Sequence, residues 1–241
     1  MSTTIRDRIG AATGAAFVAL ILIGNGMTSG VSTADSAHPT GEQVLRDVAH
    51  QASSTTFTAG FVMELLGFAA FIVFLGYLAD VLRRRGPGRE PGGIAAGTAI
   101  VSGTVMLAIK LSSAAPIGAL AIDHGQISPQ LAQVLNDMSG VAFVISWLPF
   151  AIFVAAAAAG LHRATLVGRP TAYSGLALGV AGLALSIAGV HDPLGANPLA
   201  FLLGLAWLLA VSVRLAVRPG IGARTGTTGG RTAEPRVTVS T

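Results

Sequence analysis

Two ionisable residues, Glu64 and Lys110, stand within long apolar segments of the sequence. A charge at the centre of a bilayer costs roughly 2.5–3.5 kcal/mol on insertion scales, so charged residues there face a partner, a cavity or a pathway. At helical spacing Glu64 shares a face with Gly60 and Gly67, and Lys110 shares one with Gly103, so both point toward close-packed surface. We expect an ion pair in an outward-facing cavity. It would serve either as a substrate or proton site, or as a structural pair that fixes helix order.

Histidines and carboxylates lie mostly in the segments between the apolar runs. Together they suit a divalent metal ion or a pH sensor, but they are spread over separate segments without a recognised ligand spacing. We interpret them as hydrated loop polarity and predict no metal site; a lipid-modifying enzyme would need them to converge on one metal. The residues concerned are His38, His50, His124, His191, Asp35, Glu42, Asp47, Asp123, Asp137 and Asp192.

Motifs of the common enzyme classes are absent from the sequence. It contains no cysteine, which excludes disulfides, thiolate metal sites and a cysteine nucleophile. There is no His-Glu-x-x-His motif, phosphate-binding loop or dinucleotide fingerprint, and no pair of histidines within the apolar segments to ligate a haem. Ser102 and Ser174 lie in apolar segments without a histidine to act as a base. We predict no catalytic residue and no cofactor, which favours a non-enzymatic protein.

The composition is that of an integral membrane protein. Of the 241 residues, 52% are hydrophobic and 11% charged, whereas a soluble domain has about 25% charged residues. A bilayer core about 30 Å thick needs about 20 apolar residues per helical span. We predict an all-α bundle of six transmembrane helices within residues 1–218. The six segments are Ile9–Met27, Thr58–Leu82, Gly93–Ser113, Val141–His162, Ala172–Val190 and Leu199–Val217.

Basic residues lie almost entirely on one side of these segments. With the N-terminus inside, thirteen arginines fall on the inner side and only Arg46 on the outer side. This asymmetry predicts that both termini are cytoplasmic. The net charge of +4 is then a topology signal, and we expect no nucleic-acid partner. The preference for arginine over lysine, with abundant alanine and glycine, indicates a bacterial source and hence the bacterial cytoplasmic membrane.

The connecting segments differ in length and character. We expect outer loops at about 28–57, 121–140 and 191–198, with a short surface helix near Gly41–Gln51 in the first. The tail 219–241 is rich in glycine, threonine and arginine, and we expect it to be disordered. The first apolar segment has a signal peptide as its alternative, because Arg6 and Arg8 precede it. Its run of nearly twenty residues exceeds the usual 7–15 of a signal peptide, which favours an uncleaved span.

Small residues follow one face of the fifth apolar segment. Their spacing of 4, 3, 4 and 3 residues predicts a packing seam inside the bundle, with a homodimer seam or a cofactor groove as the alternatives. In the fourth segment Pro149 predicts a kink. The residues of the seam are Gly175, Gly179, Gly182, Ser186 and Gly189.

The sequence resembles a group of six-span membrane proteins of unknown function that is common in actinobacteria. The resemblance covers most of residues 9–218. Such proteins often carry Pro-Arg-Trp before the fifth span, where this chain has Gly168-Arg169-Pro170-Thr171. No activity is established for the group, so the resemblance implies the fold and no chemistry. It rests on Phe61–Leu82 ending in Ala79-Asp80-Val81-Leu82-Arg83-Arg84, on Leu135-Asn136-Asp137-Met138 leading into Val141–Pro149, and on Leu202–Arg214 with Trp207.

Two functional hypotheses follow from these observations. The first is a non-enzymatic membrane protein that binds a lipid, a small apolar ligand or a protein partner through its outer half. The second is a small ion-coupled transporter that uses Glu64 and Lys110. The partners we expect are the lipid bilayer and either a second copy of the chain or another membrane protein.

Overall fold

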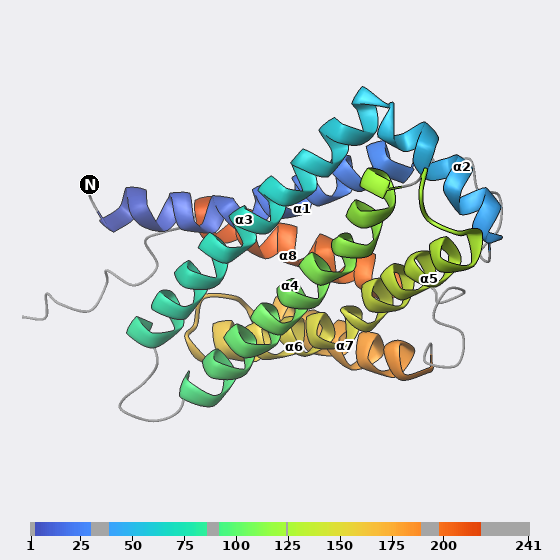
Figure 1. The fold of residues 1–241 in the computed structure, drawn as a ribbon. Helices are drawn as coiled ribbons and strands as arrows, with labels where there is room; N and C mark the ends of the chain where they lie inside the picture. The colour runs from blue at the N-terminus through green and yellow to red at the C-terminus, as the bar shows by residue number, and fades with distance from the viewer. Residues whose placement is uncertain (1–2, 30–38, 86–91, 124, 189–197, 218–241) are drawn as a thin grey trace, which may run out of the picture.

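The computed structural model describes residues 3–29, 39–85, 92–123, 125–188 and 198–217. These residues are almost entirely helical, and Figure 1 shows the helices as one elongated bundle. The predicted tail 219–241, the turn 191–198 except its last residue, and Gly189 of the predicted seam lie outside them. The helices are α1 (Thr3–Ser29), α2 (Gly41–Ala52), α3 (Thr55–Arg85), α4 (Gly92–Asp123), α5 (Pro129–Ile145), α6 (Trp147–Arg163), α7 (Arg169–Ala188) and α8 (Leu199–Val217).

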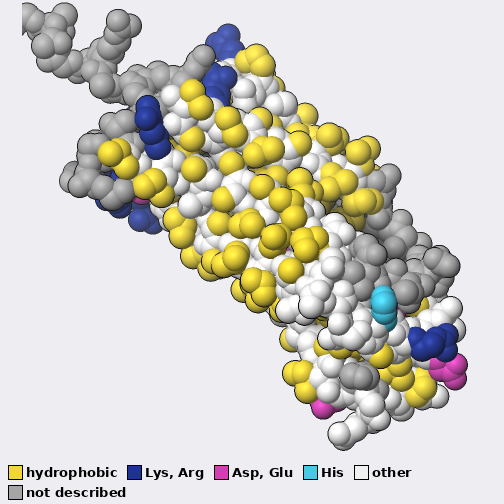
Figure 2. Space-filling view, turned by 90° about the horizontal axis from the view of Figure 1, so that it is seen from above, with side chains coloured by type: hydrophobic (Ala, Val, Ile, Leu, Met, Phe, Trp, Pro, Cys, Tyr) yellow, Lys and Arg dark blue, Asp and Glu magenta, His cyan; other side chains and the backbone are white. Residues whose placement is uncertain are grey.

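Six helical stretches are long and apolar enough to cross a membrane, which confirms the predicted number of spans. Five of them are α1, α3, α4, α7 and α8, and the sixth consists of α5 and α6 together. The chain is therefore a multi-pass membrane protein. Large apolar side chains such as Leu66, Ile72 and Val180 are exposed around the bundle, as expected for surfaces that face lipid. In Figure 2 hydrophobic side chains cover the middle of one face, and the charged side chains lie toward its ends.

The two ends of the bundle differ in charge. At the arginine end, where α1 begins and α3 ends, the Arg84 side chain contacts both Asp80 of its own helix and Asp7 of α1, the latter at 3.3 Å. Arg6 approaches Asp80 at 3.9 Å. These contacts join α3 to α1 at the arginine end. The opposite end, where α2 lies, is called the α2 end below.

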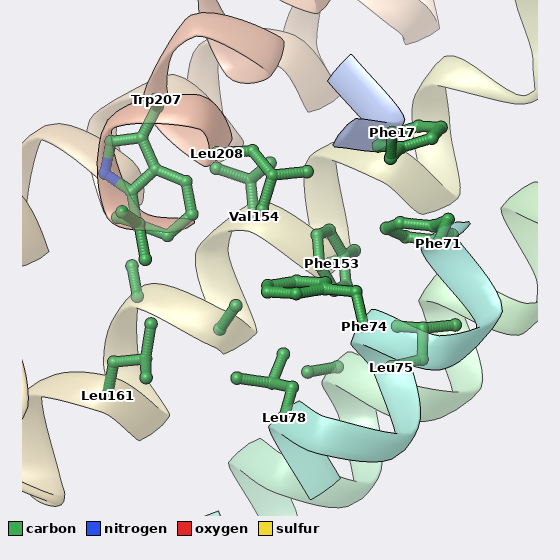
Figure 3. Close-up of a cluster of buried hydrophobic side chains, with 14 of the residues drawn as sticks. Phe17, Phe71, Phe74, Leu75, Leu78, Phe153, Val154, Leu161, Trp207 and Leu208 are labelled. Atoms are coloured by element: carbon green, nitrogen blue, oxygen red, sulfur yellow. The ribbon is translucent and has the colours of Figure 1, made fainter. Parts of the chain in front are cut away.

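Aromatic and aliphatic side chains from six helices (α1, α3, α4, α6, α7 and α8) form the core between the ends. Phe71 of α3 lies at its centre, 4.5 Å from the ring of Phe17 of α1 and 5.4 Å from the ring of Phe153 of α6, measured between ring centroids. Figure 3 shows these rings with Val154 and Leu208 facing the same interior. Phe71 and Phe153 are completely buried. This core holds α1, α3 and α6 in fixed positions below the α2 end.

The region predicted as outer loop 121–140 is largely helical instead. Helix α5 begins at Pro129, directly after Ser128, whose hydroxyl accepts a hydrogen bond from the Leu131 N–H. A serine cap followed by proline at the first helical position is a helix start signal, which explains why this region is helical although polar residues lie nearby. Helix α4 also runs ten residues beyond the predicted end at Ser113, to Asp123, with Pro116 inside it.

The surface helix predicted near Gly41–Gln51 is present as α2. Thr40 caps it, with the Gln43 N–H donating to the threonine hydroxyl and the Gln43 side chain accepting from the Thr40 N–H. Val44 and Val48 are buried in a small cluster with residues of α4 and α5. Helix α2 therefore lies across the ends of α4 and α5 (Figure 1).

The kink predicted in the fourth span appears as a break between α5 and α6. The break falls at Ser146, three residues before Pro149. Proline has no N–H to donate to the carbonyl of Ile145, so the helical hydrogen bonding is interrupted there. On either side of Ser146 the chain has different neighbours: α5 contacts α2 and α4, while α6 packs against α4 and α7.

The small residues of α7 face α6 and α8. Gly175 lies against Trp207 and Ala158, Gly179 against Ala155, and Gly182 against Ala151. Gly175, Gly179, Gly182 and Ser186 are all buried. In the described part of the fifth span, these residues therefore contact other helices of the same chain.

Candidate functional site

A cavity of about 300 Å³ opens at the α2 end of the bundle. Side chains of α1, α2, α3, α4, α5 and α8 line it. The lining is mostly apolar, and six of the ten phenylalanines of the chain contribute to it. Small-molecule pockets in proteins have this size and character, with volumes from about 300 Å³ upward and few polar groups. The six are Phe17, Phe57, Phe61, Phe68, Phe143 and Phe201.

Lys110 of α4 places its ammonium group in this cavity. The residue is 6% exposed, and its Nζ atom has no hydrogen-bond partner among the described residues. The Nζ atom lies 2.8 Å from the ring centroid of Phe143 and 5.1 Å from that of Phe201. These rings offer a cation–π attraction, which is worth up to about 2 kcal/mol in a desolvated site. That attraction is smaller than the several kcal/mol that burying an ammonium costs.

The serine side chains beside Lys110 are already hydrogen bonded elsewhere. The Ser113 hydroxyl donates to the backbone carbonyl of Lys110 at 2.8 Å. The Ser139 hydroxyl of α5 donates to the backbone carbonyl of Ser113 at 2.7 Å. Both bonds use the only hydroxyl proton for backbone acceptors. The Ser139 bond joins α5 to α4, the helix that carries the lysine, whereas the Ser113 bond lies within α4.

Glu64 of α3 lies in the same cavity and is half-buried. The Thr28 hydroxyl of α1 lies 3.1 Å from its Oε1 atom and 3.1 Å from the backbone carbonyl oxygen of Asn25, so its one proton is shared between these two acceptors. Helices α1 and α3 approach closely at this level, because a Cβ atom on Gly24 would lie 2.7 Å from both the Gly60 carbonyl oxygen and the Glu64 Cγ atom. The two glycines thus bring α1 near enough for Thr28 to hold the carboxylate.

The expected direct ion pair between Glu64 and Lys110 is not formed. No nitrogen–oxygen contact within 4.0 Å joins them, although their charges attract across the cavity. The reason is that each side chain is held on its own side, Glu64 by Thr28 of α1 and Lys110 by the rings of α5 and α8. The cavity therefore presents a carboxylate and an ammonium that are separated from each other.

Helix α2 and the start of α3 border the cavity. Gln51 of α2 and Phe57 of α3 line it. The Gln51 side-chain amide donates to Asp47 Oδ2 at 2.8 Å, which holds the glutamine side chain against its own helix. The position of α2 on the cluster around Val44 and Val48 thus sets one wall of the site.

The residues considered for a metal site do not come together where the structure describes them. Among the described residues no three His, Asp or Glu side chains are grouped as ligands for a metal ion. Glu42 is engaged with Arg46 at 3.9 Å, and Asp47 with Gln51. His50, Asp123 and Asp137 are also described and belong to no such group. The other five candidates lie outside the described residues: Asp35, His38, His124, His191 and Asp192.

Comparisons with known proteins identify no relative: no protein-family model, no curated protein and no solved structure matches the chain. The geometry of the cavity is accordingly the basis for a functional proposal.

Sequence reasoning found Glu64 and Lys110 but missed three residues that define their surroundings. Thr28 was assigned to a loop, whereas it lies in the last turn of α1. Phe143 and Phe201 looked like ordinary apolar residues of their spans, and no local pattern marked them as neighbours of Lys110. The hydroxyl of Thr28 just past an apolar run was the one available signal.

Proposed function

We propose that this multi-pass membrane protein binds a small, largely apolar ligand in the cavity at its α2 end. The observation that carries the proposal is the buried ammonium of Lys110, which lacks a hydrogen-bond partner among the described residues and faces a cavity lined by phenylalanines. A buried polar group without a partner destabilises a fold, and such groups are retained where they serve a function. A ligand that accepts a hydrogen bond would satisfy the ammonium while its apolar part contacts the rings.

A purely structural role explains the arrangement less well. A structural pair stabilises a fold when its members touch, because each then compensates the burial of the other. Glu64 and Lys110 share a cavity without a direct contact, and the carboxylate is engaged by Thr28. The geometry therefore favours binding.

Filling the cavity tests the proposal. We expect at least one of a panel of lipids, quinones, divalent metals and small solutes to raise the melting temperature of the detergent-solubilised protein in a dose-dependent way. A ligand that binds only the folded state adds about 2.7 kcal/mol at 100 times its dissociation constant. The variant Ala114→Trp places an indole in the cavity and should abolish the rise. The exposed Ala108 of the same helix provides the control Ala108→Trp, which should keep it. An unchanged rise in Ala114→Trp would contradict this site.

A second candidate function is an ion-coupled carrier. The observation that favours it is the position of Glu64, a carboxylate held between α1 and α3 inside the same cavity as Lys110. If the protein is a carrier, Glu64→Gln in liposomes should abolish uptake of a bound solute, whereas the exposed Glu42→Gln should not. Uptake by Glu64→Gln equal to that of the wild type would exclude the carrier and leave the binding protein.

We place the arginine end in the cytoplasm of a bacterial cell. The support is the excess of Arg6, Arg8, Arg83 and Arg84 at this end over the single Arg46 at the other, in keeping with the positive-inside rule. The ligand cavity then opens toward the outer half of the membrane. A reporter that is active only outside the cytoplasm, fused after residue 241, should be inactive, and activity would reverse the orientation.

A further inference from the structure

The two charged groups of the cavity define the chemical class of its ligand. Building on the proposed function, we propose that the ligand is a zwitterion with an aromatic body. Its anionic group contacts the Lys110 ammonium, and its cationic group contacts the Glu64 carboxylate. Lys110 is buried and has no hydrogen-bond partner among the described residues, while Glu64 faces the same cavity from α3 without an ion pair to Lys110.

Ligands with a single charge fit this cavity less well. A monoanion would satisfy Lys110 but would bring a second negative charge near Glu64. A monocation would satisfy Glu64 and leave the ammonium uncompensated, and a hydrocarbon would leave both groups as they are. Like charges in a desolvated site are costly, and matched opposite charges determine which partner binds. A zwitterion leaves the net charge of the site unchanged and satisfies both groups.

The phenylalanines favour an aromatic body. Phe143 and Phe201 lie 6.4 Å apart at an interplanar angle of 62°, and both rings lie near the Lys110 nitrogen. On the α1 and α3 side the cavity is bordered by Phe17, Phe61 and Phe68. Aromatic groups pack against such rings in edge-to-face or offset geometry, which adds about 0.5–1.5 kcal/mol beyond the burial of area.

The chemistry has two sources that an experiment must separate. One is a free zwitterion such as an aromatic amino acid. The other is a membrane lipid with an ammonium and a phosphate in its headgroup, such as phosphatidylethanolamine. Both carry the two charges, but the lipid has acyl chains in place of the aromatic body, so we expect the free zwitterion to bind more tightly.

Three probes with one aromatic body and different charges test the inference. We would measure the dissociation constants of L-phenylalanine, phenethylamine and 3-phenylpropionate by isothermal titration calorimetry in the uncharged detergent dodecyl maltoside, which brings no zwitterionic lipid to the cavity. Loss of one partner of a desolvated charge pair costs about 2 kcal/mol or more, which corresponds to about 30-fold in affinity. We therefore expect L-phenylalanine to bind at least about 30-fold more tightly than either singly charged probe. Competition by phosphatidylethanolamine, but not by phosphatidylglycerol, would reveal the lipid as the source.

Single substitutions should exchange the preference among these probes. In Glu64→Gln the preference should move to 3-phenylpropionate, because the repulsive carboxylate is gone. In Lys110→Met it should move to phenethylamine, because the only remaining charge is the carboxylate of Glu64. Glu42→Gln, which removes an exposed carboxylate at the same end, should leave the order of the probes unchanged. Gel filtration and the melting temperature of each variant verify that it is folded.

The outcomes separate the two proposals. One outcome is that neither the three probes nor phosphatidylethanolamine binds, while another compound of the panel binds in a way that Ala114→Trp abolishes. The proposal of a zwitterionic ligand is then wrong, and the proposal of a binding cavity stands. If 3-phenylpropionate or phenethylamine binds as tightly as L-phenylalanine, the zwitterion is likewise wrong. If nothing in the panel binds in a way that Ala114→Trp abolishes, the proposed function itself fails.

Discussion

Lys110→Met is expected to raise the melting temperature of the unliganded protein, although it removes the only lysine of the chain. The Lys110 ammonium is buried and donates no hydrogen bond to any described residue, and only aromatic rings attract it at close range. Methionine has a similar length and no charge, so it fills the same space without the cost of desolvation. Replacing buried ionic groups by apolar side chains of similar volume stabilises proteins by about 1–4 kcal/mol in favourable cases. Losing the attraction to Glu64 reduces the gain in the free energy of unfolding, so we expect a gain in the lower part of that range.

Thermal unfolding in detergent measures this effect, and Arg46→Met provides the control. Arg46 also lies at the α2 end, but its side chain is 69% exposed and pairs with Glu42 at 3.9 Å. An exposed ion pair contributes about 0–1 kcal/mol, so Arg46→Met should leave the melting temperature nearly unchanged. A loss of stability in Lys110→Met that is coupled to the loss in Glu64→Gln would show instead that the two residues form a structural pair.

The stability and binding effects of Lys110→Met should have opposite signs. The same substitution that stabilises the unliganded protein should weaken any ligand that contacts the ammonium. This opposition is the expected signature of a residue kept for function at the expense of stability. If Lys110 had a structural role, Lys110→Met would lower the melting temperature of the unliganded protein. If it had no role, the substitution would leave the affinity for the ligand unchanged.

The six spans were predictable because each depends on a local property of the sequence. About twenty consecutive apolar residues suffice to indicate a helix that crosses a bilayer. Helix α2 was also predictable, from the spacing of Val44 and Val48 and from the pair Glu42 and Arg46. Helix α5 was missed although its start signal at Ser128 and Pro129 is local.

The separation of Glu64 from Lys110 could not be predicted in the same way. Their positions in two antiparallel spans put both residues at a similar depth in the membrane. The structure places both in one cavity. The missing ion pair depends on Thr28, Phe143 and Phe201, which belong to three other helices. Such contacts arise from the packing of helices far apart in the sequence, and no periodicity within one segment encodes them.

Gly179→Ala is the second substitution for which we expect a large effect, and it should destabilise the bundle. A Cβ atom at this position would lie 2.6 Å from the Cβ of Ala155 and 2.8 Å from the backbone carbonyl oxygen of Ala151. Both neighbours belong to α6, and neither is the flexible end of a side chain. Helices α6 and α7 must therefore move apart to admit a single methyl group. Overpacking of this kind typically costs about 1–3 kcal/mol.

Gly97→Ala is the matched control, since it adds the same methyl group to a helix at an exposed position. A Cβ atom on Gly97 of α4 would meet no heavy atom within 4 Å apart from its chain neighbours and the backbone of its own helix. Alanine is the better helix former by about 1 kcal/mol, so this variant should be as stable as the wild type or more stable. Equilibrium unfolding in mixed micelles with increasing dodecyl sulfate would measure both. Equal stability of the two variants would contradict the close contact between α6 and α7.

The same pair of variants separates a seam within the chain from a seam between two copies. The buried face of α7 contacts α6 and α8 of its own chain through Gly175, Gly179 and Gly182. Gly179→Ala should therefore lower the free energy of unfolding while the folded fraction keeps its mass in detergent. If the glycines instead joined two copies, the substitution would convert a dimer into a monomer at nearly constant stability of the protomer. Light scattering coupled to gel filtration distinguishes these results, because it measures the mass of the folded protein. A seam between two copies predicts a change in this mass, and a seam within the chain predicts a change only in the free energy of unfolding.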